Sequence, residues 1–219
     1  MLTNVETARQ NMIENQVRPW EVLDLRVLDV LRSVRREDFV PAQYRELAFA
    51  DMALPIGHGE TLLKPVVEGR LLQALALEPE ETVLEIGTGT GFLAACLAGL
   101  CTTVTSVEQH ADLSAGARAR LSAANIENVH LEIADAMRDF KPAQTFDAVV
   151  VGGAVASLPE RFRSWVKPGG RLVAIVGESP AMQVTRYVRA DGNHWTSESL
   201  FETDVAYLKN AEPPRRFTL

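Results

Sequence analysis

The feature that most constrains the fold is residues 83–92, where a short apolar run breaks into alternating glycines and then continues as an apolar helix. Gly87, Gly89 and Gly91 permit positive backbone φ angles and leave room for a ligand that a Cβ atom would exclude. The following helix presents unpaired N–H groups to a polar or anionic group. This order of strand, glycine loop and helix indicates an adenosine-containing cofactor, although a tight turn alone also favours such glycines.

Strands and helices alternate on both sides of this loop. The segments expected to form strands are 82–86, 103–107, 129–133, 146–151 and 171–176, and the expected helices are 92–99, 113–124 and 158–166. Nearly continuous apolar strands separated by helices predict a parallel sheet covered on both faces. Residues 182–189, 195–201 and 205–208 predict further, antiparallel strands at its edge. The predicted fold class is therefore α/β, a doubly wound, mostly parallel sheet with N-terminal helices and an antiparallel C-terminal edge.

The N-terminal part is expected to be mainly helical. One helix should carry Leu23, Val27, Leu31 and Val34 on one face, and a later one should start at Pro65. We expect the charged run 35–38 to be a solvated helix end. Residues 39–61 are too broken by proline and glycine to be regular, yet apolar enough to pack over another element. We predict a single domain over residues 1–219: an N-terminal cap region (1–77), a cofactor-binding core (78–180) and C-terminal strands with a tail (181–219).

Polar residues follow the strands at the edge where a doubly wound sheet binds its ligand. Glu108 lies about twenty residues beyond the loop, where a carboxylate can accept hydrogen bonds from both ribose hydroxyls. A solvated strand end is the alternative. Asp135 could meet the exocyclic amine of adenine or, equally, cap the next turn. Gly152 leaves room for a ligand, but a turn needs such a residue too.

The glycine spacing separates two cofactor classes. Dinucleotide folds typically use Gly-x-Gly-x-x-Gly, whereas the third glycine here arrives one residue earlier. The loop is followed by Glu108 after the second strand, Asp135 after the third, and a Lys-Pro-Gly-Gly turn at 167–170. This combination resembles the class I S-adenosylmethionine-dependent methyltransferases. This resemblance implies S-adenosyl-L-methionine as cofactor, S-adenosyl-L-homocysteine as product and no metal. The implied cofactor-binding residues are Glu85, Gly87, Thr88, Gly89, Gly91, Glu108, Gln109, Asp135, Ala136 and Gly152.

The region ahead of the loop resembles one family more closely. Residues 39–41 (Phe-Val-Pro), 48–51 (Ala-Phe-Ala-Asp) and 54–65 (Leu-Pro-Ile-Gly-His-Gly-Glu-Thr-Leu-Leu-Lys-Pro) are similar to the protein-L-isoaspartate O-methyltransferases, and the resemblance runs from about residue 12 to residue 176. It implies methyl transfer to a carboxylate of a protein or peptide substrate, with Thr61 as the catalytic residue. The implied substrate pocket consists of Leu54, Pro55, Ile56, Gly57, His58, Glu60, Leu62 and Leu63.

The chain departs from the family pattern within this segment. The family has Leu-Pro-Ile-Gly-x-Gly-Gln-Thr-Ile-Ser-x-Pro, and its serine orients the substrate carboxylate; Leu63 stands at that position and Glu60 replaces the glutamine. Thr61 is retained, either as the orienting hydroxyl or as a cap of the next helix. His58 is either a general base or a surface-loop residue. The alternatives to protein carboxyl methylation are a different, small-molecule acceptor and a non-catalytic cofactor-binding adaptor.

Composition narrows the possible partners. A net charge of −7 argues against sequence-independent binding to nucleic acid or an anionic membrane. No apolar run has the length of a membrane span and the N-terminus has no leader pattern, so we expect a cytoplasmic protein. Cys96 and Cys101 have no metal-site spacing and are expected to be buried thiols. The sequence does not specify an oligomeric state.

Overall fold

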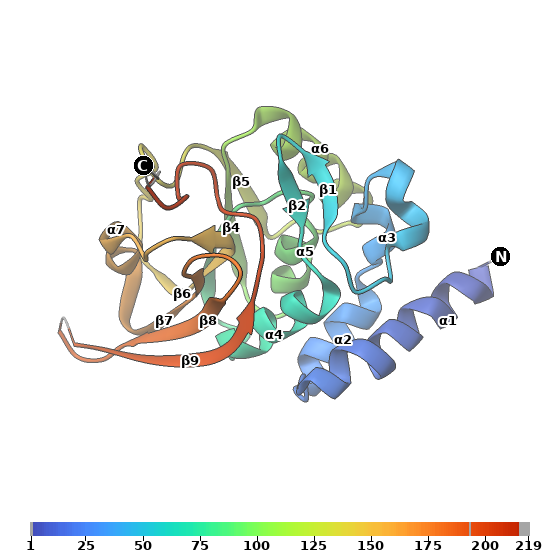
Figure 1. The fold of residues 1–219 in the computed structure, drawn as a ribbon, viewed down its shortest axis with the longest axis horizontal. Coiled ribbons are helices and arrows are strands. Elements are labelled where there is room, and N and C mark those ends of the chain that lie inside the picture. The colour runs from blue at the N-terminus through green and yellow to red at the C-terminus, as the bar shows by residue number, and fades with distance from the viewer. Residues whose placement is uncertain (1, 193, 215–219) are drawn as a thin grey trace, which may run out of the picture.

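The computed structural model describes residues 2–192 and 194–214 of the 219-residue chain. This part contains a seven-stranded sheet of order β5-β4-β3-β6-β7-β8-β9 (Figure 1). The strands are β3 (Thr82–Ile86), β4 (Thr103–Glu108), β5 (Val129–Ile133), β6 (Phe146–Val155), β7 (Val166–Val176), β8 (Met182–Arg189) and β9 (Trp195–Thr203). Strands β3 to β7 pair in parallel, and β8 and β9 add antiparallel partners. The predicted fold class is confirmed.

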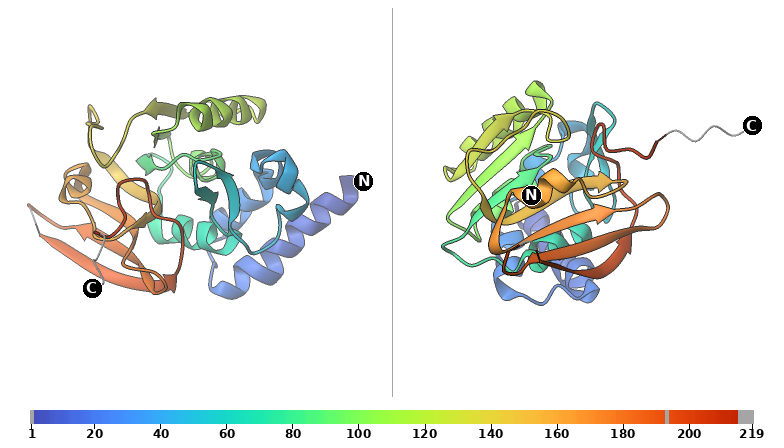
Figure 2. Two further views of the ribbon diagram at one scale, coloured as in Figure 1. Left: turned by 45° about the horizontal axis from the view of Figure 1, so that its top comes forward. Right: turned by 90° about the vertical axis from the view of Figure 1, so that its left-hand side faces the viewer.

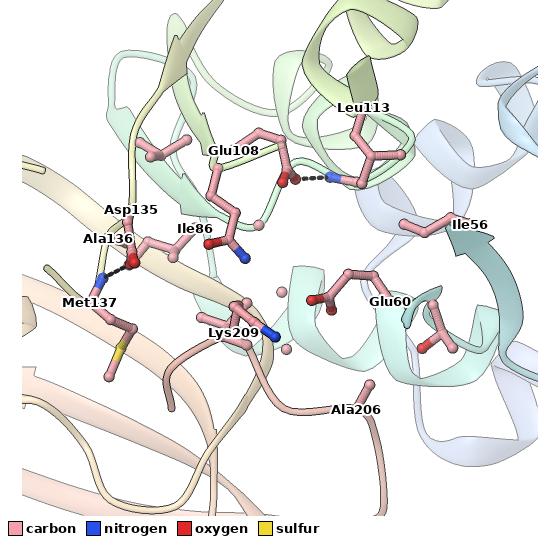
Figure 3. A pocket seen from close by; sticks show the side chains of 18 of the residues that line it. Ile56, Glu60, Ile86, Glu108, Leu113, Asp135, Ala136, Met137, Ala206 and Lys209 are labelled. Carbon is pink, nitrogen blue, oxygen red and sulfur yellow. Dashed lines mark hydrogen bonds between the residues drawn. The ribbon is translucent and has the colours of Figure 1, made fainter. Parts of the chain in front are cut away.

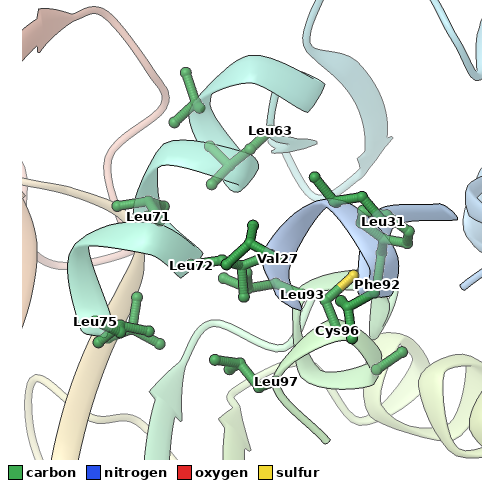
Figure 4. Close-up of a cluster of buried hydrophobic side chains, with 14 of the residues drawn as sticks. Val27, Leu31, Leu63, Leu71, Leu72, Leu75, Phe92, Leu93, Cys96 and Leu97 are labelled. Carbon is green, nitrogen blue, oxygen red and sulfur yellow. The ribbon is translucent and has the colours of Figure 1, made fainter. Parts of the chain in front are cut away.

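Both faces of the central strands β3, β4, β6 and β7 are largely buried, which explains their continuous apolar runs. On β3, Val83 packs into one apolar cluster, whereas Leu84 and Ile86 pack into the other. The helices that accompany the sheet are α4 (Pro65–Leu75), α5 (Phe92–Ala98), α6 (Ala111–Ala123) and α7 (Glu160–Ser164). Side chains of α4 and α5 belong to the first cluster (Figure 4), and Phe162 of α7 belongs to the second.

The N-terminal helices pack beside α4 and α5. They are α1 (Leu2–Met12), which continues through a π-helical turn (Ile13–Val17) and a 3₁₀ turn (Arg18–Trp20), then α2 (Leu25–Ser33) and α3 (Arg36–Phe39). Val27 and Leu31 are buried as predicted, but Leu23 is 66% exposed. The prediction that Leu23 lies on the buried face of this helix was wrong. Asp24 is the N-cap of α2, and its side chain accepts a hydrogen bond from the Arg26 N–H, so Leu23 precedes the helix.

The charged run 35–38 is only partly solvated, contrary to our prediction: Arg35 and Asp38 are exposed, but Arg36 and Glu37 are buried. Arg36 is 0% exposed and Glu37 is 4% exposed. The Glu37 carboxylate accepts hydrogen bonds from the guanidinium of Arg9 in α1, at 2.5 and 3.3 Å. Arg36 pairs with Glu68 of α4, which is equally buried. Arg36 and Glu37 are tolerated inside the protein because each pairs with a residue of opposite charge.

Residues 39–61 are more regular than predicted. They contain a 3₁₀ helix (Ala42–Leu47) and a hairpin of β1 (Leu54–Gly57) and β2 (Glu60–Leu62). Gly57, His58 and Gly59 form the turn, with φ angles of 106°, 55° and 84°. The hairpin packs over the glycine loop, since Ile56 Cδ1 lies 3.1 Å from where a Cβ atom of Gly89 would stand. The expectation that this stretch packs over another element is therefore confirmed.

The C-terminal segment does not form the predicted strand at 205–208. The backbone of this segment forms only an isolated bridge, between Tyr207 and Ala154 of β6. In this bridge the Ala154 N–H donates to Ala206 O at 2.9 Å, and the Leu208 N–H donates to Ala154 O at 2.8 Å. The segment crosses the carboxyl end of β6 and runs beside the β1–β2 hairpin (Figure 2). Residues 215–219, the end of the predicted tail, lie outside the described part. No described helix has the length and apolarity needed to cross a bilayer.

Candidate cofactor and acceptor site

A cavity opens at the carboxyl ends of β3, β4, β5 and β6 (Figure 3). Strands β3 and β6 are neighbours whose onward connections run in opposite directions, which is the topological switch point where such sheets bind ligands. The residues that line the cavity are Ile56, Glu60, Thr61, Leu63, Ile86, Gly87, Gly89, Val107, Glu108, Gln109, Leu113, Ala134, Asp135, Ala136, Met137, Gly152, Gly153, Ala206, Leu208 and Lys209.

The glycine loop forms the floor of this cavity. Gly87, Gly89 and Gly91 have φ angles of 92°, 53° and 89°, so each adopts the left-handed conformation that favours glycine. Gly87 and Gly89 line the cavity, whereas Gly91 is the N-cap of α5 and lies outside the lining. A Cβ atom on Gly152 would come within 3.0 Å of Gly87 O. Only a glycine at that position lets β6 approach the loop so closely.

Glu85 and Thr88 support the loop from beneath and do not line this cavity. The Ser106 hydroxyl donates a hydrogen bond to Glu85 and lies 2.5 Å from the Thr88 hydroxyl, which joins the ends of β3 and β4. Burial raises the pKa of Glu85 to about 8, against the opposing effect of the Ser106 hydrogen bond. Glu85 is therefore mostly neutral at pH 7. Thr88 borders a smaller, adjoining cavity.

Glu108 occupies the end of β4 and faces the cavity beside Gln109. Its Oε2 accepts a hydrogen bond from the Gly89 N–H at 2.9 Å, and its Oε1 accepts one from the His110 N–H at 2.9 Å. An ionised carboxylate has about four acceptor positions, so each oxygen keeps one for a ligand. This arrangement fits two adjacent ribose hydroxyls while also holding the glycine loop in place.

Asp135 caps a turn and also lines the cavity. Its Oδ1 accepts a hydrogen bond from the Met137 N–H at 2.8 Å, and its Oδ2 accepts one from the Asn210 side chain at 2.7 Å. The turn-capping alternative is thus present in the structure. Ala136 lines the cavity next to it, and the predicted contact of Asp135 with adenine stays a prediction.

The β1–β2 hairpin contributes part of the predicted acceptor pocket. Ile56, Glu60, Thr61 and Leu63 line the cavity, and Leu62 borders the smaller one. Leu54, Pro55, Gly57 and His58 lie outside the lining. Leu54 is buried in the core, and Pro55 and Gly57 are exposed.

His58 turns away from the cavity toward the start of α6. Its Nε2 lies 2.9 Å from a carboxylate oxygen of Asp112, and its ring stacks on His110 at 3.9 Å between centroids. These contacts clamp the tip of the hairpin to α6. The structure therefore supports a surface-loop histidine rather than a general base.

Thr61 and Leu63 both line the cavity, but they differ in their contacts with the rest of the protein. The N-cap of α4 is Lys64, and the Thr61 hydroxyl makes no hydrogen bond within the described residues, so Thr61 does not cap this helix. Leu63 is 5% exposed; it belongs to the apolar cluster of Figure 4, and its carbonyl accepts a hydrogen bond from Arg36 at 2.7 Å. Thr61 is thus the free hydroxyl on this wall, and Leu63 is its apolar part.

Comparison with known proteins identifies the family. Residues 7–210 match the family model described as protein-L-isoaspartate(D-aspartate) O-methyltransferase (PCMT). The chain belongs to this family. A protein-L-isoaspartate O-methyltransferase of Methylorubrum populi is 39% identical over 184 residues, which cover 84% of this chain and 86% of that protein. One of Myxococcus xanthus is 40% identical over 170 residues, covering 77% and 80%.

A solved structure supports the same fold. A Plasmodium falciparum protein, named as a beta-aspartate methyltransferase (PCMT) and crystallised with S-adenosyl-L-homocysteine, superposes with a TM-score of 0.78 at 20% identity and covers 92% of this chain and 98% of that one. This likeness confirms the fold, and membership of the PCMT family confirms the predicted class, an S-adenosylmethionine-dependent methyltransferase. Within the described residues, no group of His, Cys, Asp and Glu could hold a metal ion.

The main residues that the sequence missed belong to the C-terminal segment. Ala206, Leu208 and Lys209 line the cavity, joined by Leu113 of α6 and Met137. The apolar run before Lys209 has strand propensity, and propensity alone does not identify the backbone with which it pairs. Cys96 and Cys101 are buried free thiols, as predicted.

Proposed function

We propose that this PCMT-family protein transfers a methyl group to the free carboxylate of an isoaspartyl residue in a protein or peptide. The observation that carries the proposal is a single cavity in which Gly87, Gly89 and Glu108 face Thr61 and Leu63 of the hairpin. Cofactor residues and acceptor residues therefore meet in one space, as direct transfer between two bound molecules requires.

The residues present fit S-adenosylmethionine. Gly87, Gly89 and Gly152 line the cavity without a Cβ atom, Glu108 keeps acceptor positions for the ribose, and Ala136 and its neighbours bound the space for adenine. When bound, this cofactor supplies a methyl group activated by its sulfonium. The residues of the chain hold the two reactants and exclude water.

The acceptor needs no general base in this reaction. A carboxylate has a pKa of about 4 and is already ionised at pH 7. The position of His58 outside the cavity is consistent with this requirement. What the site must supply is alignment, for which the Thr61 hydroxyl is the available donor, and a dry wall, which Ile56 and Leu63 form.

The proposal is tested by methyl-ester formation on an isoaspartyl peptide, with the matching aspartyl peptide as control. We expect wild-type turnover on the isoaspartyl peptide alone. Leu63→Ser should raise kcat/KM by up to about tenfold, since an added neutral hydrogen bond contributes about 0.5–1.5 kcal/mol. If neither protein forms an ester although both bind S-adenosylmethionine, the proposal fails and a cofactor-binding adaptor is the better account.

We also propose that the protein acts in the cytoplasm and does not bind nucleic acid. Buried free thiols at Cys96 and Cys101 are in keeping with a reducing compartment. Glu60, Glu108 and Asp135 line the cavity, and such acidic groups repel a polyanion.

A further inference from the structure

Lys209 stands out among the residues of the cavity. Its side chain points into the cavity from the C-terminal segment, across from Glu60 of the hairpin (Figure 3). It is the one lysine or arginine among the described residues that line the cavity, whereas Glu60, Glu108 and Asp135 are acidic. No described residue accepts a hydrogen bond from its ammonium group or pairs with it within 4.0 Å.

Two of the three carboxylates already have partners in the protein. Glu108 accepts two backbone N–H groups, and Asp135 accepts hydrogen bonds from a backbone N–H and from Asn210. No described residue donates a hydrogen bond to the Glu60 carboxylate. Burial and the charge of Glu108 raise the pKa of Glu60, and Lys209 opposes that rise. Glu60 and Lys209 are thus the charged groups of the cavity lining that have no hydrogen-bond partner among the described residues.

The backbone around Lys209 is fixed on both sides. The Leu208 N–H donates to Ala154 O at 2.8 Å, and the Asn210 side chain donates to Asp135 at 2.7 Å. The Ala211 N–H donates back to Leu208 O at 3.0 Å. The ammonium group is therefore delivered to the cavity by an anchored segment, and only the flexible side chain of Lys209 has to adjust.

We propose that Lys209 binds the acceptor carboxylate, and that Glu60, across the cavity from it, repels that carboxylate. An anionic acceptor that enters a cavity lined by three carboxylates is repelled unless a cation compensates, and Lys209 is the cation in place. This inference rests on the proposed function. It assigns recognition of the acceptor's charge to the C-terminal segment, while the hairpin supplies the Thr61 hydroxyl.

The proposed contact is compatible with the chemistry of transfer. One carboxylate oxygen accepts a hydrogen bond from the Lys209 ammonium group, and the other forms the new bond to the methyl carbon. The bond between that carbon and sulfur breaks, and its electron pair stays on sulfur, so the sulfonium becomes a neutral thioether. No proton is transferred, and Lys209 remains charged throughout.

The test uses the full chain, an isoaspartyl peptide and S-adenosylmethionine. Lys209→Gln should raise the peptide KM by about tenfold, as expected for a lost charge-assisted hydrogen bond, with a smaller change in kcat. Lys209→Arg should retain a low KM. Glu60→Gln should lower the KM, because it removes a carboxylate that repels the acceptor. Lys141→Gln, at an exposed position outside the cavity lining, is the matched control and should change nothing.

Two further measurements separate the possible failures. Calorimetry should show that Lys209→Gln binds S-adenosylmethionine as tightly as the wild type; equal weakening of both ligands would overturn the inference and assign Lys209 to the cofactor. An unchanged peptide KM in Lys209→Gln, with normal wild-type turnover, would refute the inference and leave the proposed function standing. Absence of wild-type ester formation would instead refute the proposed function, and the inference with it.

Discussion

Replacement of Arg36 by methionine tests how the acceptor side of the cavity is held. The guanidinium of Arg36 is fully buried, with its Nε donating to Ala48 O at 2.9 Å and one Nη donating to Leu63 O at 2.7 Å. The other Nη pairs with Glu68, and the group lies 4.7 Å from the centroid of the Phe92 ring. One side chain therefore connects α3, the end of the hairpin, α4 and α5.

The expected loss follows from what Arg36→Met leaves behind. Methionine fills a similar apolar volume, but the buried Glu68 carboxyl loses its cationic partner and two carbonyls lose their donor. Breaking a buried pair in this way costs about 3–5 kcal/mol. Because a domain has about 5–15 kcal/mol of stability, the variant should unfold at a much lower urea concentration.

The double variant Arg36→Met/Glu68→Leu separates the pair from its surroundings. Replacing both charges with apolar groups should recover much of the stability, so the effects of the two single substitutions should be strongly non-additive. Urea unfolding followed by circular dichroism gives the free energies of all four proteins. A loss below about 1 kcal/mol in Arg36→Met, or additive single effects, would refute the reasoning.

The pH dependence has a defined sign. Burial raises the pKa of Glu68 to about 7, and Arg36 opposes the shift. The folded state therefore binds this proton more tightly than the unfolded chain, and its contribution to stability falls as pH rises from the ordinary carboxyl value toward 7. Without Arg36 the pKa of Glu68 rises further. The loss of stability in Arg36→Met should thus be larger at about pH 8 than at about pH 5.5.

Two further predictions concern the cofactor. Glu108→Gln should weaken S-adenosylmethionine binding about tenfold in calorimetry, because neutral hydrogen bonds replace charge-assisted ones. Glu132→Gln on the exposed edge of β5 is the control. Unchanged affinity in Glu108→Gln would mean that the ribose lies elsewhere. Gly152→Ala should also weaken binding, since its Cβ atom would stand 3.0 Å from Gly87 O and push the loop. Thermal unfolding of the cofactor-free Gly152→Ala protein should show that it still folds. Wild-type affinity for S-adenosylmethionine in this variant would contradict the role of the close approach between Gly152 and Gly87.

Local patterns predict much of the sheet and the cofactor half of the site. Strands 82–86, 129–133 and 182–189 have the bounds that the apolar runs indicate. Glu108 could be placed near Gly89 from the sequence because β3 and β4 are adjacent parallel strands, whose carboxyl ends meet at one edge. In such cases the informative residues are close in sequence or related by a short, regular connection.

Burial of charge could not be predicted in this way. The run 35–38 has the composition of a solvated helix end, yet Arg36 finds Glu68 and Glu37 finds Arg9 across distant parts of the chain. Each partner lies in another helix, and helix packing decides whether the two charges meet. Propensity and periodicity contain no information about such a pairing.

The sequence by itself determined the fold class, the family resemblance and the glycine loop with Glu108, because these depend on local backbone conformation and on strand order. Only the tertiary structure decided which acceptor residues face the cavity. It turned His58 toward Asp112 and brought Lys209 across the carboxyl end of β6 to face Glu60. The physical reason is that a short C-terminal segment has no partner of its own, so its place depends on the surface that the completed sheet offers.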